Sequence, residues 1–528
     1  MKLNKGSALA PFWGRPVNLI TGLDPLGLQT TSEALYTWLL PGVTNLTNRA
    51  RYYGFYCWLI DLYHKREKTG NSFHQRAFMR RAELLVAIIM QDNYPEVQQI
   101  TGSTFASGMI ESNEEGFYDL KLGADQDKSD STYWKFHTGA FGQYYFGAMR
   151  ALGLVQRASN AEGDTIFRLT EREEGTCGQQ YARCFDIELD DAFRNLFYES
   201  VKNGRLYKKD IDVFIRFLAI STVDSDTLEW GAYRTAFLGP DDPFGENEEL
   251  GYHRRDTILS LIQLARQQEG KFDPALLLSA CYAGKLSEDE TAMGWYCYQI
   301  NEYWQFACGL IFWSILQDLA NRSVEQYLSF YIKDMSDDIA AEICKLLDIG
   351  YSEAVLLQDI LDLIDGEGLS ENGLLFSFPA KEGTSTVLAA RDAFLSLMVT
   401  LKHNRNELDE LYNFIQVRKL IRDGDFHQGL SYLLRFSGKS LAAFIELFLN
   451  NKIINRHQFV ALRKMGNGQQ STQKFIIDEG YIRLVEIYPP NFTSPRFTAI
   501  RNILADMQVI DANNELTQLS HQFFGDDQ

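Results

Sequence analysis

Arginine and tyrosine side chains alternate in residues 1–85 in a pattern that could bind a nucleic-acid strand. The tyrosines are Tyr52, Tyr53, Tyr56 and Tyr63, and the arginines among and after them are Arg49, Arg51, Arg66, Arg76, Arg80 and Arg81. Of these, Arg49, Arg51, Arg80 and Arg81 are the expected nucleic-acid-binding residues. Aromatic rings stack on bases and guanidinium groups bind phosphates, so this combination is typical of single-strand sites. The alternative interpretation is that the rings form a hydrophobic core while the arginines pair with the acidic majority of the chain.

The charge of the chain is unevenly distributed. The 528 residues carry a formal net charge of −19, whereas residues 1–85 contain 11 Lys or Arg and 5 Asp or Glu, a net charge of +6. The remainder therefore carries −25. A chain this acidic repels polyanions overall, so we expect any contact with nucleic acid in the N-terminal region or in a local site.

The usual catalytic and metal-binding motifs fail a check of their spacing. Gly438-Lys439-Ser440 has the closing residues of a phosphate-binding P-loop, but Leu433 stands where that loop requires its first glycine. The seven cysteines form no Cys-x-x-Cys pair and do not cluster with histidines at zinc-ligand spacing. We therefore expect reduced thiols, no metal and no cofactor.

Arg422 and His427 form an Arg-x4-His motif within the segment Arg-Asp-Gly-Asp-Phe-His. This motif resembles that of the HEPN ribonucleases, an all-helical family. The resemblance implies that His427 is the general acid/base for a ribose 2′-hydroxyl and that Arg422 holds the scissile phosphate. A turn between two helices explains the same residues, because Gly424 weakens a helix at this point.

The hydrophobic period changes within residues 141–170. Residues 142–152 predict a helix that ends at Gly153, and residues 154–157 and 165–170 predict two strands around a polar turn. Leu169-Thr170-Glu171 is expected to open another helix.

This order resembles the recognition helix and wing of bacterial winged helix-turn-helix domains, over about 50 residues at 131–185. The resemblance implies that helix 142–152 enters the major groove of DNA and that the hairpin contacts backbone phosphates. The residues carried over are Gln143 and Arg150 on the helix, and Arg157 and Arg168 on the wing. The helix departs from the pattern because it has a single arginine among aromatic residues. A role in binding protein is the alternative.

The fold class predicted is mainly α: a multi-domain helical protein with one or two small winged-helix (α+β) modules. We expect a helical, locally basic N-terminal domain (1–100), the winged-helix-like module (131–185), a helical domain (186–365), a helical segment (386–445) and a C-terminal winged-helix-like module (446–528). That last module would combine strands in 475–488 with a helix that Ser494 caps and Pro495 begins.

Residues 303–316 form the most apolar stretch, and at 14 residues it is too short for a membrane span, so we expect a buried helix. The first residues lack the pattern of a signal peptide. A cytoplasmic protein without membrane association is the expectation. The aromatic cluster between Trp295 and Trp313 favours a core over a ligand pocket.

We therefore expect a non-enzymatic regulatory or scaffolding protein that acts through winged-helix surfaces on DNA or on partner protein subunits. A bacterial defence or chromosome-associated assembly is the context that the fold-level analogy suggests. One alternative is a HEPN-like ribonuclease or toxin effector that uses Arg422 and His427. Another is a small-molecule sensor built around the aromatic cluster.

Overall fold

The computed structural model describes residues 18–19, 24–67, 71–113, 115–125, 136–159, 163–172, 177–239, 251–284, 289–364, 368–376, 385–465 and 470–524. Within these ranges the chain is mainly helical, and each sheet has only two or three strands. The prediction of a mainly α fold with small α+β elements is confirmed. None of the described helices is both long and apolar enough to cross a membrane.

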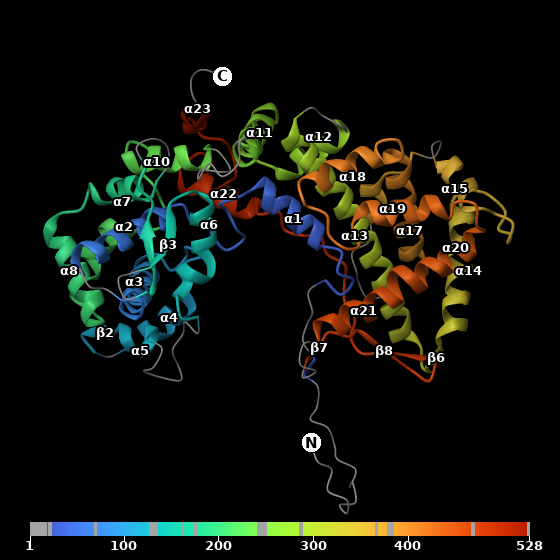
Figure 1. Ribbon diagram of the computed structural model, residues 1–528, viewed down its shortest axis with the longest axis horizontal. Coiled ribbons are helices and arrows are strands. Elements are labelled where there is room, and N and C mark those ends of the chain that lie inside the picture. The colour runs from blue at the N-terminus through green and yellow to red at the C-terminus, as the bar shows by residue number, and fades with distance from the viewer. Residues whose placement is uncertain are drawn as a thin grey trace, which may run out of the picture. The chain divides into compact units, whose positions relative to one another are not determined.

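The chain divides into two compact units, which Figure 1 shows as a ribbon coloured by residue number. The first unit contains the described residues of 1–35 and 297–493, and the second those of 36–296 and 494–528. Each unit is thus built from two segments that are far apart in the sequence. Residues 446–528, expected to form one module, are divided between the two units.

Helices α2 (Arg51–Arg66) and α3 (Ser72–Asn93) form the core of the second unit. Their apolar side chains are buried on nearly every side, as expected of helices enclosed by protein. The ring of Trp58 lies 4.8 Å from that of Phe197, and α2 packs against α7 (Gly178–Asp186). The aromatic rings of the N-terminal region thus belong to the core.

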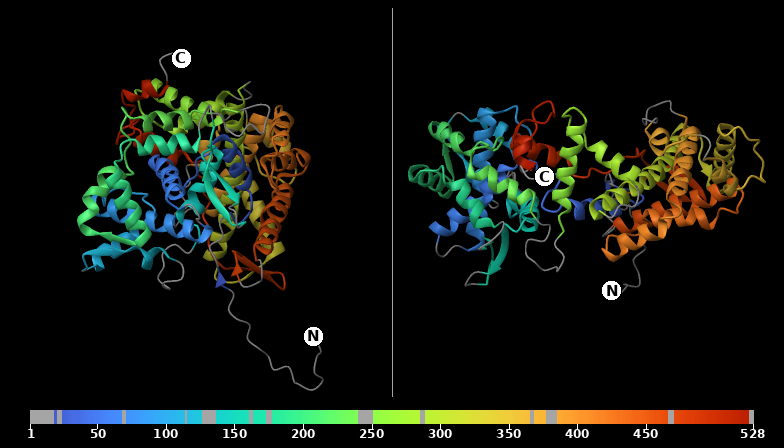
Figure 2. Two further views of the ribbon diagram at one scale, coloured as in Figure 1. Left: turned by 60° about the vertical axis from the view of Figure 1, so that its left-hand side comes forward. Right: turned by 90° about the horizontal axis from the view of Figure 1, so that it is seen from above.

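Shorter elements surround this pair of helices. The helical ones are α4 (Ser103–Ser112), α5 (Leu120–Ala124), η1 (Phe141–Tyr145), α6 (Phe146–Ala151), α8 (Asp191–Asn203), η2 (Lys208–Asp210), α9 (Ile211–Leu218), α10 (Leu228–Phe237), α11 (His253–Gln267), α12 (Pro274–Gly284), α22 (Phe497–Asp506) and α23 (Leu519–Phe524). The strands form two antiparallel pairs, β2 (Phe117–Asp119) with β5 (Arg205–Tyr207) and β3 (Val155–Ser159) with β4 (Thr165–Leu169). Figure 2 shows the β3–β4 hairpin in teal at the periphery of this unit.

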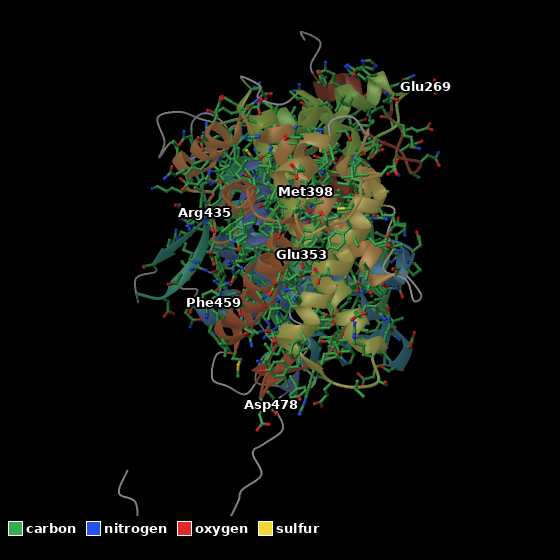
Figure 3. The ribbon with its side chains drawn as sticks, turned by 90° about the vertical axis from the view of Figure 1, so that its right-hand side faces the viewer. Glu269, Glu353, Met398, Arg435, Phe459 and Asp478 are labelled. Carbon is green, nitrogen blue, oxygen red and sulfur yellow. The ribbon has the colours of Figure 1, made fainter. Side chains whose placement is uncertain are left out.

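The first unit is a helical bundle with a small sheet. It contains the C-terminal part of α13 (Glu290–Asn321) with α14 (Leu328–Leu346), α15 (Leu357–Leu363), α16 (Glu371–Leu375), α17 (Thr386–Asn404), α18 (Leu408–Val417), α19 (Phe426–Arg435), α20 (Leu441–Phe448), η4 (Leu449–Ile454) and α21 (Asn455–Lys464). Strands β6 (Gln326–Tyr327), β9 (Tyr481–Leu484) and β8 (Phe475–Asp478) form a three-stranded sheet in that order. In addition, β1 (Asn18–Leu19) pairs in parallel with β7 (Gln470–Ser471). Figure 3 labels Met398 of α17, which is buried, and Phe459 of α21, which is exposed.

The expected buried helix at 303–316 is part of α13, and its aromatic rings are enclosed. Trp304 and Trp313 expose only 2% and 3% of their surface. The indole N–H of Trp304 donates a hydrogen bond to the carbonyl of Gly424. These rings are therefore part of the hydrophobic core, as the sequence favoured for the aromatic cluster.

Helix α22 begins two residues later than the sequence suggested. Its first residue is Phe497, and the preceding residue, Arg496, has a left-handed φ of 66° that interrupts the helix. The guanidinium of Arg496 donates hydrogen bonds to the carbonyl of Leu40 and to the hydroxyl of Thr37. These contacts fix the backbone at Arg496, so Ser494 and Pro495 lie before the helix.

Candidate nucleic-acid interface

The helix expected to enter a DNA groove is present as η1, a π-helical turn, followed directly by α6. Its buried side includes Phe141, Tyr145 and Phe146. Its exposed positions include Gln143 and Arg150, seven residues apart. The burial pattern thus places both of the predicted helix residues toward solvent.

The start of this helix is fixed by a buried carboxylate. The two side-chain oxygens of Glu83 accept hydrogen bonds from the backbone N–H groups of Ala140 and Phe141, at 3.0 and 2.7 Å. The hydroxyl of Tyr56 donates a third, at 3.2 Å. Burial raises the pKa of Glu83 to about 7, although these hydrogen bonds oppose the shift. Gly139, with a φ of +65°, is required here because a Cβ would lie 2.4 Å from Glu83 Oε2.

The β3–β4 hairpin is anchored to the core through the backbone of Phe167. Gln75 accepts the Phe167 N–H and donates to the Phe167 carbonyl, both at 2.8 Å. The ring of Phe167 lies 4.9 Å from that of Phe141 and 5.1 Å from that of Phe146. The hairpin and the helix therefore form one packed unit, called here the helix–hairpin unit (residues 139–159 and 163–170).

Alternation along the strands separates the two wing arginines. In the register of the hairpin, Arg157 is opposite Phe167, and Arg168 is opposite Gln156. Because successive side chains point to opposite faces, Arg157 and Arg168 lie on different faces of the hairpin. The guanidinium of Arg157 lies 4.8 Å from the ring centroid of Phe146, and Arg150 follows Phe146 by four positions, about one turn of α6. The structure thus places Arg150 and Arg157 around Phe146 and leaves Arg168 on the other face of the hairpin, while Gln143 is exposed in the preceding π-helical turn.

These exposed arginines are not neutralised within the described part of the chain. Arg150, Arg157 and Arg168 make no ion pair among the described residues. The third arginine, Arg168, lies near His64 and lowers the pKa of that histidine, although burial of the imidazole is the larger cause. All three guanidinium groups are consequently available to an anionic ligand.

The N-terminal arginines are used inside the protein instead. Arg49 pairs with Asp506 at 2.6 Å, and Arg51 pairs with Glu229 at 3.1 Å. Arg81 pairs with Asp125 at 2.6 Å. Arg80 exposes 2% of its surface and donates to the carbonyl of Phe136. These four side chains therefore hold distant segments of the second unit together and are already engaged by groups of the chain itself.

Arg422 and His427 lie in different environments in the first unit. Arg422 is in the loop before α19 and donates to the carbonyls of Lys419 and Ile421, at 2.9 and 2.7 Å. No hydrogen bond between the described side chains joins it to His427. Gly424 has a φ of +85°, as a turn between helices requires, so the motif includes a turn.

The surroundings of His427 do not form a relay. Its ring stacks on Tyr412 at 4.1 Å, and its Nε2 lies 3.5 Å from Ser431 Oγ and 3.8 Å from Asp409 Oδ1. A nucleophile–base–acid relay needs the serine and the carboxylate on different ring nitrogens, but here both lie at Nε2. In the described ranges no group of three His, Cys, Asp or Glu side chains is arranged to hold a metal ion.

A second basic cluster was missed at the level of the sequence. Residues 202–209 read Lys-Asn-Gly-Arg-Leu-Tyr-Lys-Lys, and they lie at the end of α8, in β5 and in η2. A pocket with a volume of about 550 Å³ opens beside them, and its lining includes Lys121, Arg205 and Lys209. The sequence signal that could have identified this region is the concentration of Lys and Arg in residues 202–209 of a chain that is acidic overall.

Comparison with known proteins found no matching family model, no similar curated protein and no similar solved structure.

Proposed function

We propose that the chain is a non-enzymatic regulatory or scaffolding protein that binds duplex DNA through the helix–hairpin unit. The observation that carries this proposal is the pair Arg150 and Arg157. Both are exposed, both lie next to Phe146 (Arg157 over its ring and Arg150 one turn of α6 away), and neither has an acidic partner among the described residues. In a chain with 70 acidic and 51 basic residues, such unpaired arginines favour an external anion as partner.

The spacing of these residues fits a DNA groove. Gln143 and Arg150 are seven positions apart, which corresponds to about 10 Å along a helix axis, or roughly three base pairs. Glutamine pairs with adenine and arginine with guanine in the major groove, so both are suited to contact base edges. This axial distance assumes the rise of an α-helix. Because η1 is π-helical, the side chain of Gln143 leaves the helix axis in a different direction from that expected in a regular α-helix.

Arg157 is suited to a phosphate contact. Its guanidinium lies over the ring of Phe146, and stacking of this kind uses the flat face of the group. The N–H donors point outward from the edge of the guanidinium plane and stay available for a phosphate oxygen. The Phe146 ring thus orients a phosphate-binding group at the boundary between helix and hairpin.

The experiment is a titration of labelled duplex DNA with the full chain, followed by fluorescence anisotropy over a range of salt concentrations. Two to three phosphate contacts predict a log–log slope with salt of roughly −2 to −3. The double variant Arg150→Ala/Arg157→Ala should weaken binding by at least about tenfold and should make the slope shallower by about 1 to 2. Lys271→Ala is a matched control, because Lys271 is an exposed cation of the same unit.

Two results would overturn the proposal: no salt-dependent binding by the wild-type protein, or equal binding by the double variant. In either case the exposed helix–hairpin side would be a surface for a partner protein. The surroundings of Arg422 and His427 favour a turn between two helices over a ribonuclease site.

A further inference from the structure

The β2–β5 ribbon presents aromatic and basic side chains on the same face. Phe117 is directly opposite Tyr207 in the register, and their ring centroids are 6.0 Å apart. Strand alternation places Arg205 on this face as well, while Leu206 and Tyr118 are buried beneath it. Tyr207 keeps 41% of its surface exposed, so its ring is accessible to a ligand.

The cations around this face are held in position by the same rings. The guanidinium of Arg205 lies 5.0 Å from the centroid of Phe117, and the ammonium of Lys209 lies 5.8 Å from that of Tyr207. Lys121 approaches from α5, and its methylene chain packs against Gly204, where a Cβ would lie 2.4 Å from Lys121 Cγ. None of these three cations makes an ion pair with another described residue.

The pocket of about 550 Å³ lies where these groups converge, and Lys121, Arg205, Tyr207 and Lys209 all line it. This volume is within the range of sites that hold a small molecule of nucleotide size. Glu199 and Asp210 also line the pocket, and Glu199 already accepts a hydrogen bond from the side-chain amide of Asn203. Three cations against two carboxylates leave a local excess of positive charge.

We propose that the β2–β5 ribbon and this pocket bind single-stranded nucleic acid. Successive backbone phosphates contact Arg205, Lys209 and Lys121, one at each cation, and an unpaired base stacks on Tyr207. This site is separate from the helix–hairpin unit and does not depend on the function proposed for it.

A single strand fits this face better than a duplex. The base that stacks on Tyr207 must have an open face, whereas in a duplex both faces of a base are covered by its neighbours. The combination of exposed ring and flanking cations is the one that single-strand sites use without sequence preference. Asp119, opposite Arg205 in the register, makes no ion pair with it among the described residues, and Asp119 Oδ1 instead accepts the backbone N–H groups of Lys121 and Leu122.

The test is binding of a labelled oligodeoxythymidylate of about twelve nucleotides to the full chain, measured by anisotropy between about 50 and 200 mM salt. Contacts to three phosphates predict a log–log slope of roughly −2. The variant Arg205→Glu/Lys209→Glu should weaken binding more than about tenfold and should make the slope shallower by roughly 1.4. Both side chains are exposed, so thermal unfolding should confirm that the fold is unchanged.

The stacking contact is tested by a second pair of variants. Tyr207→Ala should weaken binding roughly five- to hundredfold, and Tyr207→Phe, which retains the ring, should restore it to within about twofold of wild type. The control Lys271→Glu/Lys333→Glu makes the same change in net charge at two exposed lysines outside the ribbon. It should leave binding nearly unchanged.

Four results would overturn the inference. The wild-type chain could fail to bind the oligonucleotide, Tyr207→Ala could bind as tightly as wild type, or the lysine control could weaken binding as much as the ribbon variant. Thymidine monophosphate binding as tightly as the strand would also contradict it, since the site would then be a small-molecule pocket. Arg150→Ala/Arg157→Ala should leave oligonucleotide binding intact, which separates a failure here from a failure of the proposed function.

Discussion

Glu83 Oε1 lies 2.7 Å from the backbone nitrogen of Phe141 and accepts its hydrogen bond inside the core of the second unit. The carboxylate of Glu83 belongs to α3, so the beginning of the exposed helix is held by a residue far from it in the sequence. The orientation of Gln143 and Arg150 therefore depends on a buried group that no ligand would touch.

Replacement of this carboxylate should weaken the helix without removing any exposed residue. In Glu83→Gln one of the two amide N–H groups of Ala140 and Phe141 faces the glutamine NH₂ and loses its acceptor. At pH 5.5, where its raised pKa keeps Glu83 neutral and no difference in charge enters, we expect the free energy of unfolding to fall by about 1–3 kcal/mol, as for other unpaired buried donors. Chemical denaturation measures it. The exposed control Glu115→Gln should change it by less than about 0.5 kcal/mol.

Buried carboxyl groups should make the chain less stable as the pH rises through neutrality. Burial raises the pKa of Glu83, Glu302 and Asp506 to about 7 in each case. A carboxyl with a raised folded-state pKa contributes stability that is fully present below its unfolded pKa of about 4 and is lost as the pH rises through about 7. We therefore expect the melting temperature to fall between pH 5.5 and 8.

Glu302→Gln isolates one of these groups. A glutamine is neutral at every pH and keeps a carbonyl oxygen for the backbone N–H of Thr493, which Glu302 accepts at 2.7 Å. The variant should be more stable than wild type at pH 8, and the difference should disappear toward pH 4.5. A constant difference across this range would show that Glu302 does not titrate with the raised pKa.

His457 should produce the opposite dependence at acidic pH. Its Nε2 accepts the backbone N–H of Lys474 at 2.9 Å, which requires an unprotonated nitrogen, and its Nδ1 lies 3.0 Å from the carbonyl of Pro25. Burial lowers the pKa of His457 to about 4. Its contribution to stability is present above the unfolded pKa of about 6.5 and is lost as the pH falls toward 4. The stability difference between wild type and His457→Gln should shrink over this window, and His74→Gln serves as an exposed control.

The anchor of the hairpin can be tested at Gln75. Gln75→Ala removes both the acceptor of the Phe167 N–H and one donor to its carbonyl, so the chain should lose about 1–3 kcal/mol of stability. If the helix–hairpin unit binds duplex DNA, this variant should also bind it more weakly at a temperature where the rest of the chain is folded. Gln75→Glu should lose at least as much at pH 8, since a buried carboxylate oxygen would face the Phe167 carbonyl in place of the amide donor. If the Gln75→Ala protein is destabilised but binds DNA as tightly as wild type, the hairpin is not part of the DNA interface.

Arg422 and His427 provide a test of the enzymatic alternative. We expect the purified chain to show no RNA cleavage that depends on His427, because His427 packs against Tyr412 while Arg422 is bonded to its own loop. Incubation of wild type and His427→Ala with labelled RNA measures this directly. Cleavage by the wild type that His427→Ala abolishes would reverse the assignment.

Local patterns in the sequence predicted local structure. The change of hydrophobic period at Gly153 predicted a helix and two strands, and η1, α6, β3 and β4 occupy those residues. The helix expected to open at Leu169 begins instead at Gly178, because the hydroxyl of Thr170 bonds to the carbonyl of Gly153 and accepts the Gly178 N–H. Thr170 is thus tied to Gly153, in the turn before the hairpin.

Contacts between distant residues could not be predicted in the same way. Arg51 and Glu229 are separated by 178 positions, and the pairing of Phe117 with Tyr207 joins two strands of three residues each. In neither pair does the sequence around one residue indicate which distant residue will contact it. The sequence therefore indicated a basic surface in the N-terminal region. The structure shows that Arg49, Arg51 and Arg81 are paired with acidic residues that are distant in the sequence.

Arg49 and Asp506 both belong to the second unit, yet they are 457 positions apart in the sequence. Burial of an arginine beside an absent carboxylate is costly, so the N-terminal segment of this unit cannot reach its final packing before residue 506 has been synthesised. Contacts of such long range also slow folding, since the chain must be closed before they form. During synthesis the N-terminal helices of this unit should therefore remain incompletely packed until the C-terminal segment has emerged. In a protein whose domains are consecutive in the sequence, each domain can fold as soon as it is made. We therefore expect this chain to depend more on chaperones than such a protein does.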